Sequence, residues 1–352
     1  MSTQFYKRQK QLSEVGDSGQ EKLKNSQVAI VGAGGLGHPV ASYLAASGVG
    51  KIALIDFDIV DESNLHRQVL FNPGDIGRNK SVVLSERIKA QNPYILVYPL
   101  VEKISRNNIH ELLSDYPIVL DCTDNFKAQF LLHDYCYYLK KDLISANLYQ
   151  FEGEIKLFKN SQRKEIHGTC LRCLWPTQPG ETCVKNCAES GILGSVAGVL
   201  GSLQATETLK LILEMPGISH GESLLVDVRD MEMTKMSWPC DSSCPLCSAP
   251  GEFEIGANDQ THDREISYFD ISDQYELIDI REEEEVLSMP IPIKWNATHI
   301  PQSQIEHNKL LDKKYLFVCR SGVRSLSLVN ELRAIGVHQT FSLKMGMARL
   351  FD

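Results

Sequence analysis

The stretch "VAIVGAGGLG", residues 28–37, decides the fold class of this chain. Val28–Val31 is an apolar run with the length of a buried strand, and Gly32, Gly34 and Gly37 then form the pattern G-x-G-x-x-G at the start of a helix. Such glycines let backbone N–H groups approach a phosphate closely, and a helix N-terminus favours its negative charge. The stretch therefore predicts a nucleotide-binding loop, but a nicotinamide dinucleotide and ATP both fit it.

Apolar runs of strand length alternate with helical stretches around this loop. The expected strands are 28–31, 51–56, 95–101, 117–121 and 142–146, and the expected helices are 38–47, 79–90 and 126–140. This alternation predicts an α/β fold with a Rossmann-like, mostly parallel sheet and helices on both faces. Two further strands are expected at 153–158 and 223–228. They flank an apolar helix within 191–205, which is too short to span a bilayer.

The composition changes after residue 248. Residues 249–263 are polar, contain Gly and Pro and lack a core pattern, which is typical of a linker. Beyond them, strands are expected at 275–280, 314–319 and 340–344, with a helix at 323–335 and an acidic helix start at 282–285. The expected domains are therefore 1–248 and 264–352, the second being a small α/β unit.

Bulk composition excludes several classes of function. The 352 residues carry 45 acidic and 36 basic side chains, a formal charge of −9, which disfavours binding to nucleic acid or to a membrane surface. The N-terminus, "MSTQFYKRQKQL", is polar and does not resemble a secretory signal, so we expect a cytoplasmic chain. Ten cysteines in such a chain indicate metal binding or thiol chemistry rather than disulfides.

The residues after the second strand favour ATP over a dinucleotide. Asp56 ends that strand, where an acid would hydrogen-bond a ribose. The segment "DFDIVDESNLHRQ" then brings Asn64, Arg67 and Gln68 together, and "GRNK" adds Lys80. Cations beyond the ribose position imply more negative charge than one glycine loop can hold, as in a triphosphate.

Two acidic motifs near these residues differ in what they predict. "VLDCTDNF", 119–126, places Asp124 and Asn125 just past the end of a strand, where ligands bind in an open α/β sheet. A carboxylate there can hold Mg²⁺ against phosphates. Asp58 and Asp61 are as well explained by capping their turn as by contact with ATP.

Taken together, these motifs resemble the ThiF/HesA/MoeB family, bacterial relatives of ubiquitin-activating enzymes. The resemblance covers about residues 5–248 and rests on "YKRQ", "VGAGGLG", "DFDIVDESNLHRQ", "GRNK", "DCTDN" and "GSLQATETLK". It implies an ATP site in which Gly35 lies against the phosphates, Asp56 holds the ribose, and Asn64, Arg67, Gln68 and Lys80 grip the triphosphate. By the same resemblance Asp124, beside Asn125, handles Mg²⁺. Arg8 reaches the γ-phosphate of the other subunit's site, which implies a homodimer.

Two positions depart from the family pattern. The family often has an arginine in the helix after "DCTDN", where this chain has Gln129, and another before "FEG", where it has Gln150. The loss of two cations puts in doubt how an acyl-adenylate or a partner's tail is held. It does not affect the residues expected to bind ATP.

Two C-x-x-C pairs offer four thiolates, the set that zinc prefers in closed structural sites. Cys170 with Cys173 and Cys244 with Cys247 are separated by 70 residues, so their spacing alone is moderate evidence for Zn²⁺. The family has both pairs at matching places, which implies a structural zinc site. Cys240 is close enough in sequence to compete as a ligand.

The other cysteines of the first domain fall into two groups. Cys183 and Cys187 lie in a polar segment before the apolar helix, and the family pattern around "NCAESGILG" points to Cys187 as the reactive thiol. A helix N-terminus there would depress its pKa. Cys183 is then an extra thiol, and Cys122 and Cys136 are expected in the core.

A third reactive motif lies in the second domain. In "FVCRSGVRS", 317–325, Cys319 ends a strand, and the loop after it is expected to curl backbone N–H groups and Arg320 and Arg324 around the sulfur. That environment stabilises a thiolate or a persulfide. With "LIDIRE" upstream, the motif resembles rhodanese sulfurtransferases over roughly 264–352. An inactive rhodanese used for contacts is the alternative, and a phosphatase would have a His where Val318 stands.

The two resemblances together imply an adenylyltransferase with sulfurtransferase activity. ATP would activate the C-terminal glycine of a ubiquitin-like sulfur carrier ending in Gly-Gly. A persulfide on Cys319, loaded by a donor such as a cysteine desulfurase, would then attack the adenylate, and Cys187 would release a thiocarboxylate for molybdenum cofactor, thiamine or tRNA thiolation. The alternatives are HesA-like adenylation of a peptide, a NAD-dependent oxidoreductase, which the Arg67 and Lys80 pattern disfavours, and a non-catalytic scaffold.

Overall fold

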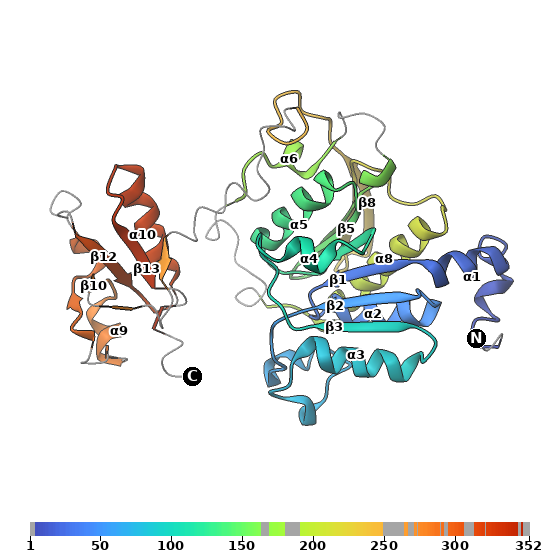
Figure 1. Cartoon of the computed structure of the whole chain (residues 1–352), viewed down its shortest axis with the longest axis horizontal. Helices are drawn as coiled ribbons and strands as arrows, with labels where there is room; N and C mark the ends of the chain where they lie inside the picture. Colours follow the sequence, from blue (N-terminus) through green and yellow to red (C-terminus); the bar gives the residue numbers. More distant parts are fainter. Residues whose placement is uncertain are drawn as a thin grey trace. The chain divides into compact units, whose positions relative to one another are not determined.

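The computed structural model divides the chain into two compact units, Met1–Asn258 and Asp259–Asp352 (Figure 1). It describes residues 4–162, 169–179, 191–248, 264–266, 271–272, 274–288, 290–291, 295–305, 313–320, 322–343 and 346–347. Each unit has a sheet and apolar clusters of its own. The expected linker at 249–263 lies outside the described residues.

An eight-stranded sheet forms the centre of the first unit, in the order β3-β2-β1-β4-β5-β6-β7-β8. Its strands are β1 (Gln27–Val31), β2 (Lys51–Ile55), β3 (Leu96–Leu100), β4 (Ile118–Asp121), β5 (Asp142–Tyr149), β6 (Glu152–Phe158), β7 (Glu222–Asp227) and β8 (Glu232–Ser237). Strands β3 to β5 pair in parallel, and β5 to β8 pair antiparallel. The predicted Rossmann-like, mostly parallel sheet is confirmed.

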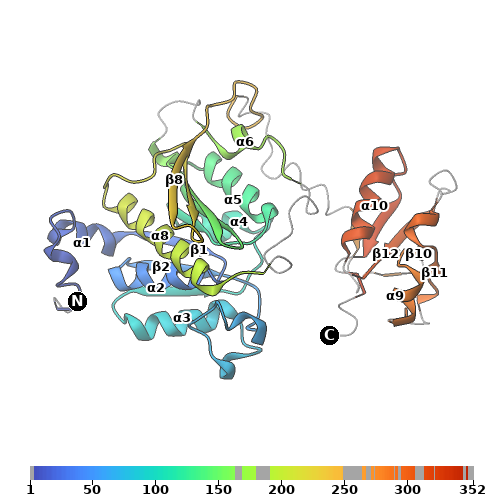
Figure 2. The same ribbon diagram turned by 180° about the vertical axis from the view of Figure 1, so that it is seen from behind.

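Helices cover both faces of this sheet (Figure 2). They are α1 (Gly16–Asn25), α2 (Gly37–Ser47), α3 (Lys80–Gln91), α4 (Ile109–Leu113), α5 (Phe126–Tyr138), α6 (Leu171–Leu174) and α8 (Gly194–Ile212), with 3-10 turns at Gln9–Gln11, Glu62–Asn64, Pro73–Asp75 and Asn160–Gln162. One apolar cluster joins the sheet to α2, α3 and α8, and a second joins its other face to α4 and α5. Burial on both faces explains why the parallel strands are continuous apolar runs.

The expected apolar helix is α8, which continues to Ile212, beyond the predicted end at 205. Among the described residues, no helix is long and apolar enough to cross a membrane.

A five-stranded parallel sheet forms the second unit, in the order β11-β10-β12-β13-β9. Its strands are β9 (Glu265–Ile266), β10 (Tyr275–Asp279), β11 (Thr298–His299), β12 (Lys314–Val318) and β13 (Thr340–Leu343), and its helices are α9 (Glu283–Ser288) and α10 (Val323–Ala334), with a 3-10 turn at Gln302–Gln304. Leu328, Val329 and Leu332 of α10 pack on β10 and β12. The sheet places the end of β12, and Cys319 after it, between neighbouring strands.

Candidate functional site

The glycine loop between β1 and α2 is shaped by close backbone approaches. Gly32 has φ +102°, and a methyl group there would lie 2.6 Å from the carbonyl oxygen of Cys122 after β4. A methyl group at Gly37 would lie 2.2 Å from the carbonyl oxygen of Gly32. At Gly34, by contrast, the nearest atom would be Gln68 Nε2, 3.9 Å away. The first and last glycines thus build the turn, and the middle one leaves its outer side open.

Asp56 joins the end of β2 to this loop. One carboxylate oxygen accepts from the backbone N–H of Ala33 at 2.7 Å, and the other accepts from the N–H of Asp58 at 2.8 Å. Burial raises the pKa of Asp56, and the two N–H donors oppose that rise. The carboxylate therefore lies beside the loop, at the carboxyl edge of the sheet where an open α/β fold binds ligands.

Segment 64–68 lies against the same loop and carries buried polar atoms without partners. The Arg67 side chain comes within 3.6 Å of where a methyl group on Gly35 would lie. Asn64 Oδ1 and Gln68 Oε1 are buried and accept no hydrogen bond from the described residues. A buried oxygen that accepts no hydrogen bond costs free energy. Such oxygens are expected in a binding site whose ligand donates a hydrogen bond or brings a group that does.

His38, the first residue after the glycine motif, belongs to this group although sequence reasoning missed it. Its Nδ1 accepts from the N–H of Leu70 at 3.1 Å, whereas its buried Nε2 has no partner among the described residues. Burial, with Lys80 adding to it, lowers the pKa of His38 to about 3, so the ring is neutral. The one sequence feature that could have indicated His38 is its position directly after Gly37, the last glycine of the motif.

Lys80 begins α3 with its side chain nearly buried. Its Nζ lies 3.1 Å from Asp58 Oδ2, and the next residue, Ser81, donates to the carbonyl oxygen of Asp56. The ammonium group is therefore held beside the end of β2. Asp61 caps its turn by accepting from the N–H of Ser63, as one of the two interpretations predicts.

Asp124 and Asn125 follow β4 and have different roles in the structure. Asp124 is exposed, and its nearest recorded partner is Asn125 Nδ2 at 3.5 Å. Asn125 is the N-cap of α5, where its Oδ1 accepts from the N–H of Ala128 at 2.9 Å. The buried Asp121 carboxylate holds the segment before them by accepting from both the N–H and the hydroxyl of Thr123.

Three other positions singled out in the sequence are Gln129 and Gln150, which carry no charge, and Arg8. Gln129 is buried and donates to Ser145 Oγ at 3.3 Å, so it fills its place in the core without a charge. Gln150 is exposed at φ +54°. Arg8 is exposed and directly precedes the first 3-10 turn.

The four cysteines of the two C-x-x-C pairs come together at one point. Cys170 Sγ lies 3.7 Å from Cys173 Sγ and 3.6 Å from Cys244 Sγ, and Cys173 Sγ lies 3.4 Å from Cys247 Sγ. All four sulfurs lie within 4.8 Å of one another. A tetrahedral zinc site with bonds of about 2.3 Å needs sulfur separations of about 3.8 Å, so the arrangement fits such a metal.

The four thiols also affect one another's protonation. The hydrogen bond from Cys170 lowers the pKa of Cys244 to about 5, and the pKa of Cys170 is raised. Successive thiolates therefore become harder to form, unless a cation offsets their charge. Cys240 is exposed and stands 3.9 Å from Cys247, outside the set of four.

The other cysteines of the first unit are partly accounted for. Cys122 and Cys136 are buried in the core, as predicted. Burial raises the pKa of both thiols, which makes them poor nucleophiles. Cys183 and Cys187 lie outside the described residues.

Cys319 is fully buried at the end of β12 and is surrounded by donors. Its Sγ accepts from the N–H of Gly322 at 3.1 Å, and Ser325 Oγ lies 3.3 Å away. Gly322 has φ +85° at the start of α10, which lets the chain turn its N–H toward the sulfur. Arg324 pairs with Glu285 at 2.5 Å and thereby lowers the pKa of Glu285. This pocket can stabilise a sulfur anion.

Known proteins resemble this chain over about two thirds of its length or more. The model of the ThiF family matches residues 6–246. A sulfur carrier protein adenylyltransferase of Thermus thermophilus is 39% identical over 242 residues, which are 69% of this chain and 89% of that protein. The probable adenylyltransferase/sulfurtransferase MoeZ of Mycobacterium tuberculosis is 31% identical, in an alignment that covers 97% of this chain and 91% of that protein.

A longer protein and a more distant one each match about 70% of this chain. The adenylyltransferase and sulfurtransferase MOCS3 of Xenopus laevis is 38% identical over 71% of this chain, which spans 54% of that protein. The crystal structure of E. coli MccB superposes with a TM-score of 0.60, covers 70% of this chain and 73% of its own, and at 24% identity is similar in fold. The family match and the T. thermophilus relative both span about two thirds of this chain. The chain therefore belongs to the ThiF family, as its motifs predicted.

Proposed function

We propose that this chain is an ATP-dependent adenylyltransferase for the C-terminal glycine of a ubiquitin-like sulfur-carrier protein, and that it also transfers sulfur to that glycine. The T. thermophilus relative is named a sulfur carrier protein adenylyltransferase, and the M. tuberculosis relative is named a probable adenylyltransferase/sulfurtransferase. The second alignment covers 97% of this chain and therefore runs through both units. The observation that carries the ATP site is the glycine loop, open at Gly34, with the Arg67 side chain against Gly35 and the Lys80 ammonium group beside the end of β2.

Each residue at the carboxyl edge has a place in this reaction. Asp56 would hold the ribose, and the glycine loop at Gly35 would lie along the phosphates. Asn64, Arg67, Gln68 and Lys80 would bind the triphosphate, and Asp124 beside Asn125 would hold Mg²⁺ against it. The carrier's terminal carboxylate attacks the α-phosphorus, the bond to the β-phosphate oxygen breaks, and pyrophosphate leaves. The cations offset charge on the leaving group.

Arg8 would complete the site of a second copy of this chain. It is exposed and far in sequence from the other phosphate-binding residues. A homodimer in which Arg8 of each subunit reaches the partner's γ-phosphate would give this arginine a role that its own subunit does not offer.

Sulfur transfer would use the second unit. A persulfide donor, such as a cysteine desulfurase, would load Cys319, whose pocket suits a sulfur anion. The terminal sulfur then attacks the acyl carbon, AMP leaves, and an acyl disulfide forms. Cys187 attacks the sulfur of Cys319, which releases the thiocarboxylate and leaves a disulfide that a cellular dithiol reduces. This thiol chemistry suits the reducing cytoplasm.

The four-cysteine cluster would hold one structural Zn²⁺. It would join α6 to the segment after β8, and with four protein ligands it leaves no position for catalysis. The carrier's pathway, whether molybdenum cofactor, thiamine or tRNA thiolation, depends on which carrier binds.

The zinc proposal predicts one zinc per chain. Replacing Cys173 by Ser should remove it and destabilise the first unit by about 3 kcal/mol or more. For a unit of this size that corresponds to a fall in melting temperature of about 6–12 °C. Elemental analysis measures the zinc content, and calorimetry measures the melting temperature. Cys240→Ser is the matched control, which should keep both the zinc and the stability. Full stability of metal-free protein would contradict a structural role.

Exchange of labelled pyrophosphate into ATP tests the adenylation. We expect exchange with an intact carrier ending in Gly-Gly and none with the same carrier lacking its last glycine. Exchange with short peptides but not with carriers would favour HesA-like peptide adenylation. Absence of exchange with every acceptor, together with NAD binding, would favour an oxidoreductase. The neighbouring cations Arg67 and Lys80 favour the triphosphate.

A further inference from the structure

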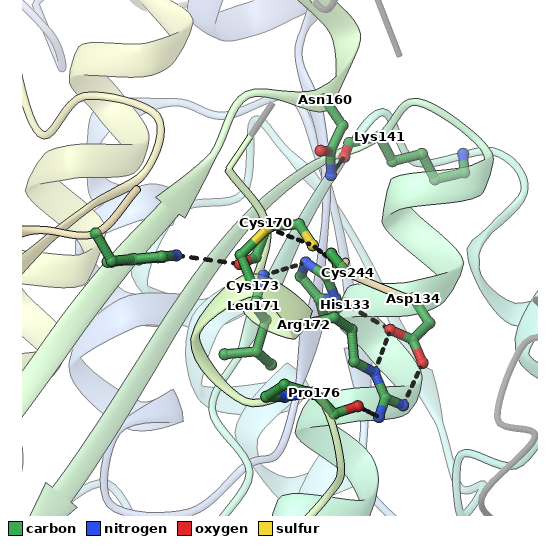
Figure 3. A network of polar contacts seen from close by, with 11 residues as sticks. His133, Asp134, Lys141, Asn160, Cys170, Leu171, Arg172, Cys173, Pro176 and Cys244 are labelled. Atoms are coloured by element: carbon green, nitrogen blue, oxygen red, sulfur yellow. Dashed lines mark hydrogen bonds and ion pairs between the residues drawn. The ribbon is translucent and has the colours of Figure 1, made fainter. Parts of the chain in front are cut away.

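A buried polar network lies directly beside the cysteine cluster, of which Figure 3 shows Cys170, Cys173 and Cys244. Its members come from the C-terminal half of α5 and from the turn that carries Cys170 and Cys173. Asp134 and Arg172 form two hydrogen bonds, at 2.7 and 3.2 Å, and both side chains are at most 1% exposed. A fully buried ion pair gives little net stability compared with apolar residues, so stability alone does not explain it.

The carboxylate is shared with a histidine that grips the metal-binding turn. His133 Nε2 accepts from the backbone N–H of Leu171 at 3.0 Å, so its proton is on Nδ1, which lies 3.1 Å from Asp134 Oδ1. Asp134 thus fixes the tautomer of His133, and His133 fixes the backbone between Cys170 and Cys173.

Arg172 lies between the two ligands and holds the same turn by its side chain. Besides Asp134 it donates to the carbonyl oxygen of Pro176 at 3.2 Å, beyond the turn. Its guanidinium carbon lies over the ring of Phe130, 4.5 Å from the ring centre, and Phe130 precedes Asp134 by one turn on α5. From the other side, Trp238 Nε1 donates to the carbonyl oxygen of Cys170 at 3.1 Å. The turn is therefore held by protein contacts before any metal contributes.

We infer that His133, Asp134 and Arg172 form a clamp, here called the α5 clamp, that holds the turn carrying Cys170 and Cys173 in the shape its metal requires. The inference rests on the proposed zinc site and assigns positioning residues to it. Outer contacts that orient metal ligands change metal affinity by about 10–100-fold when they are removed. Preorganisation of the turn should appear mainly as slow zinc loss, because the clamp keeps two ligands in place when one bond opens.

Zinc transfer to an excess of chelator, followed with the full-length chain, tests the clamp. The variant Asp134→Leu/Arg172→Met removes both charges together and fills their space, which keeps the fold because no charge is left unpaired. We expect it to retain a cooperative melting transition but to lose zinc about 10–100-fold faster than the natural chain. His133→Leu should also lose zinc faster, and His133→Gln, which keeps an acceptor for Leu171, should recover part of the retention.

An exposed ion pair of the same unit supplies the control. Lys22 Nζ and Glu214 Oε2 are also 2.7 Å apart, and Lys22→Met/Glu214→Leu should leave zinc loss unchanged. Unchanged zinc loss in the folded Asp134→Leu/Arg172→Met variant would overturn the clamp while leaving the zinc site intact. A natural chain that binds no zinc would overturn the zinc proposal, and the clamp with it.

Discussion

Replacing Asp124 by Ala should lower carrier-dependent ATP–pyrophosphate exchange by about 100- to 1000-fold, a loss of the size seen when one group that stabilises transition-state charge is removed. Asp124 is exposed at the carboxyl edge of the sheet, and its weak contact with Asn125 leaves its carboxylate oxygens accessible to a cation. In the proposed mechanism it holds Mg²⁺ on the triphosphate. Glu111→Ala, an exposed acid on α4, is the matched control and should keep full exchange.

Arg67→Ala should cause a loss of similar size for a different reason. Its Cγ packs beside Gly35, and in the proposed mechanism its guanidinium group offsets charge on the departing pyrophosphate. Arg67→Lys keeps the charge but not the fork geometry, so it should retain an intermediate rate. Asp124→Ala, Arg67→Ala and Arg67→Lys must each show a normal melting curve, so that a loss of exchange is not due to unfolding. Normal exchange by both alanine variants would exclude this edge of the sheet as the ATP site.

The central sheet was predictable because strands that are buried on both faces consist of consecutive apolar residues, which are visible in the sequence. β1, β2 and β4 are covered on both faces, so each is a continuous apolar run. β8 was missed because every residue from Glu232 to Ser237 is exposed on an edge strand, and nothing selects an apolar pattern there. α1 was missed because it buries only Gly19, Gln20 and Leu23.

The candidate site was predictable only where a motif keeps its residues close in sequence. Asp56 and Arg67 could be placed from the strand end and the segment that follows it. His38 could not, because its importance comes from an unpartnered ring nitrogen that appears only after folding. The contact between His133 and Leu171 joins residues 38 positions apart, and no local pattern specifies such a pair.

Activation and sulfur transfer should separate cleanly when Cys319 is replaced. Cys319→Ala should keep carrier-dependent pyrophosphate exchange within about twofold, because Asp124, Arg67 and Lys80 all belong to the first unit. It should lose thiocarboxylate formation even when a persulfide donor is supplied, since the sulfur proposed to carry the persulfide is missing from its pocket. Mass spectrometry of the carrier measures the product as a gain of one sulfur in place of one oxygen.

The pocket around Cys319 makes this expectation specific to one sulfur. Its Sγ is buried and accepts from the N–H of Gly322, a setting that stabilises an anion, whereas Cys240 is exposed and lies beside the four-cysteine cluster. Cys240→Ala should therefore retain thiocarboxylate formation. Free sulfide must be excluded from the assay, because it attacks an acyl-adenylate directly and would replace the missing thiol. With sulfide absent, a full yield of thiocarboxylate from Cys319→Ala would mean that the second unit takes no chemical part in sulfur transfer.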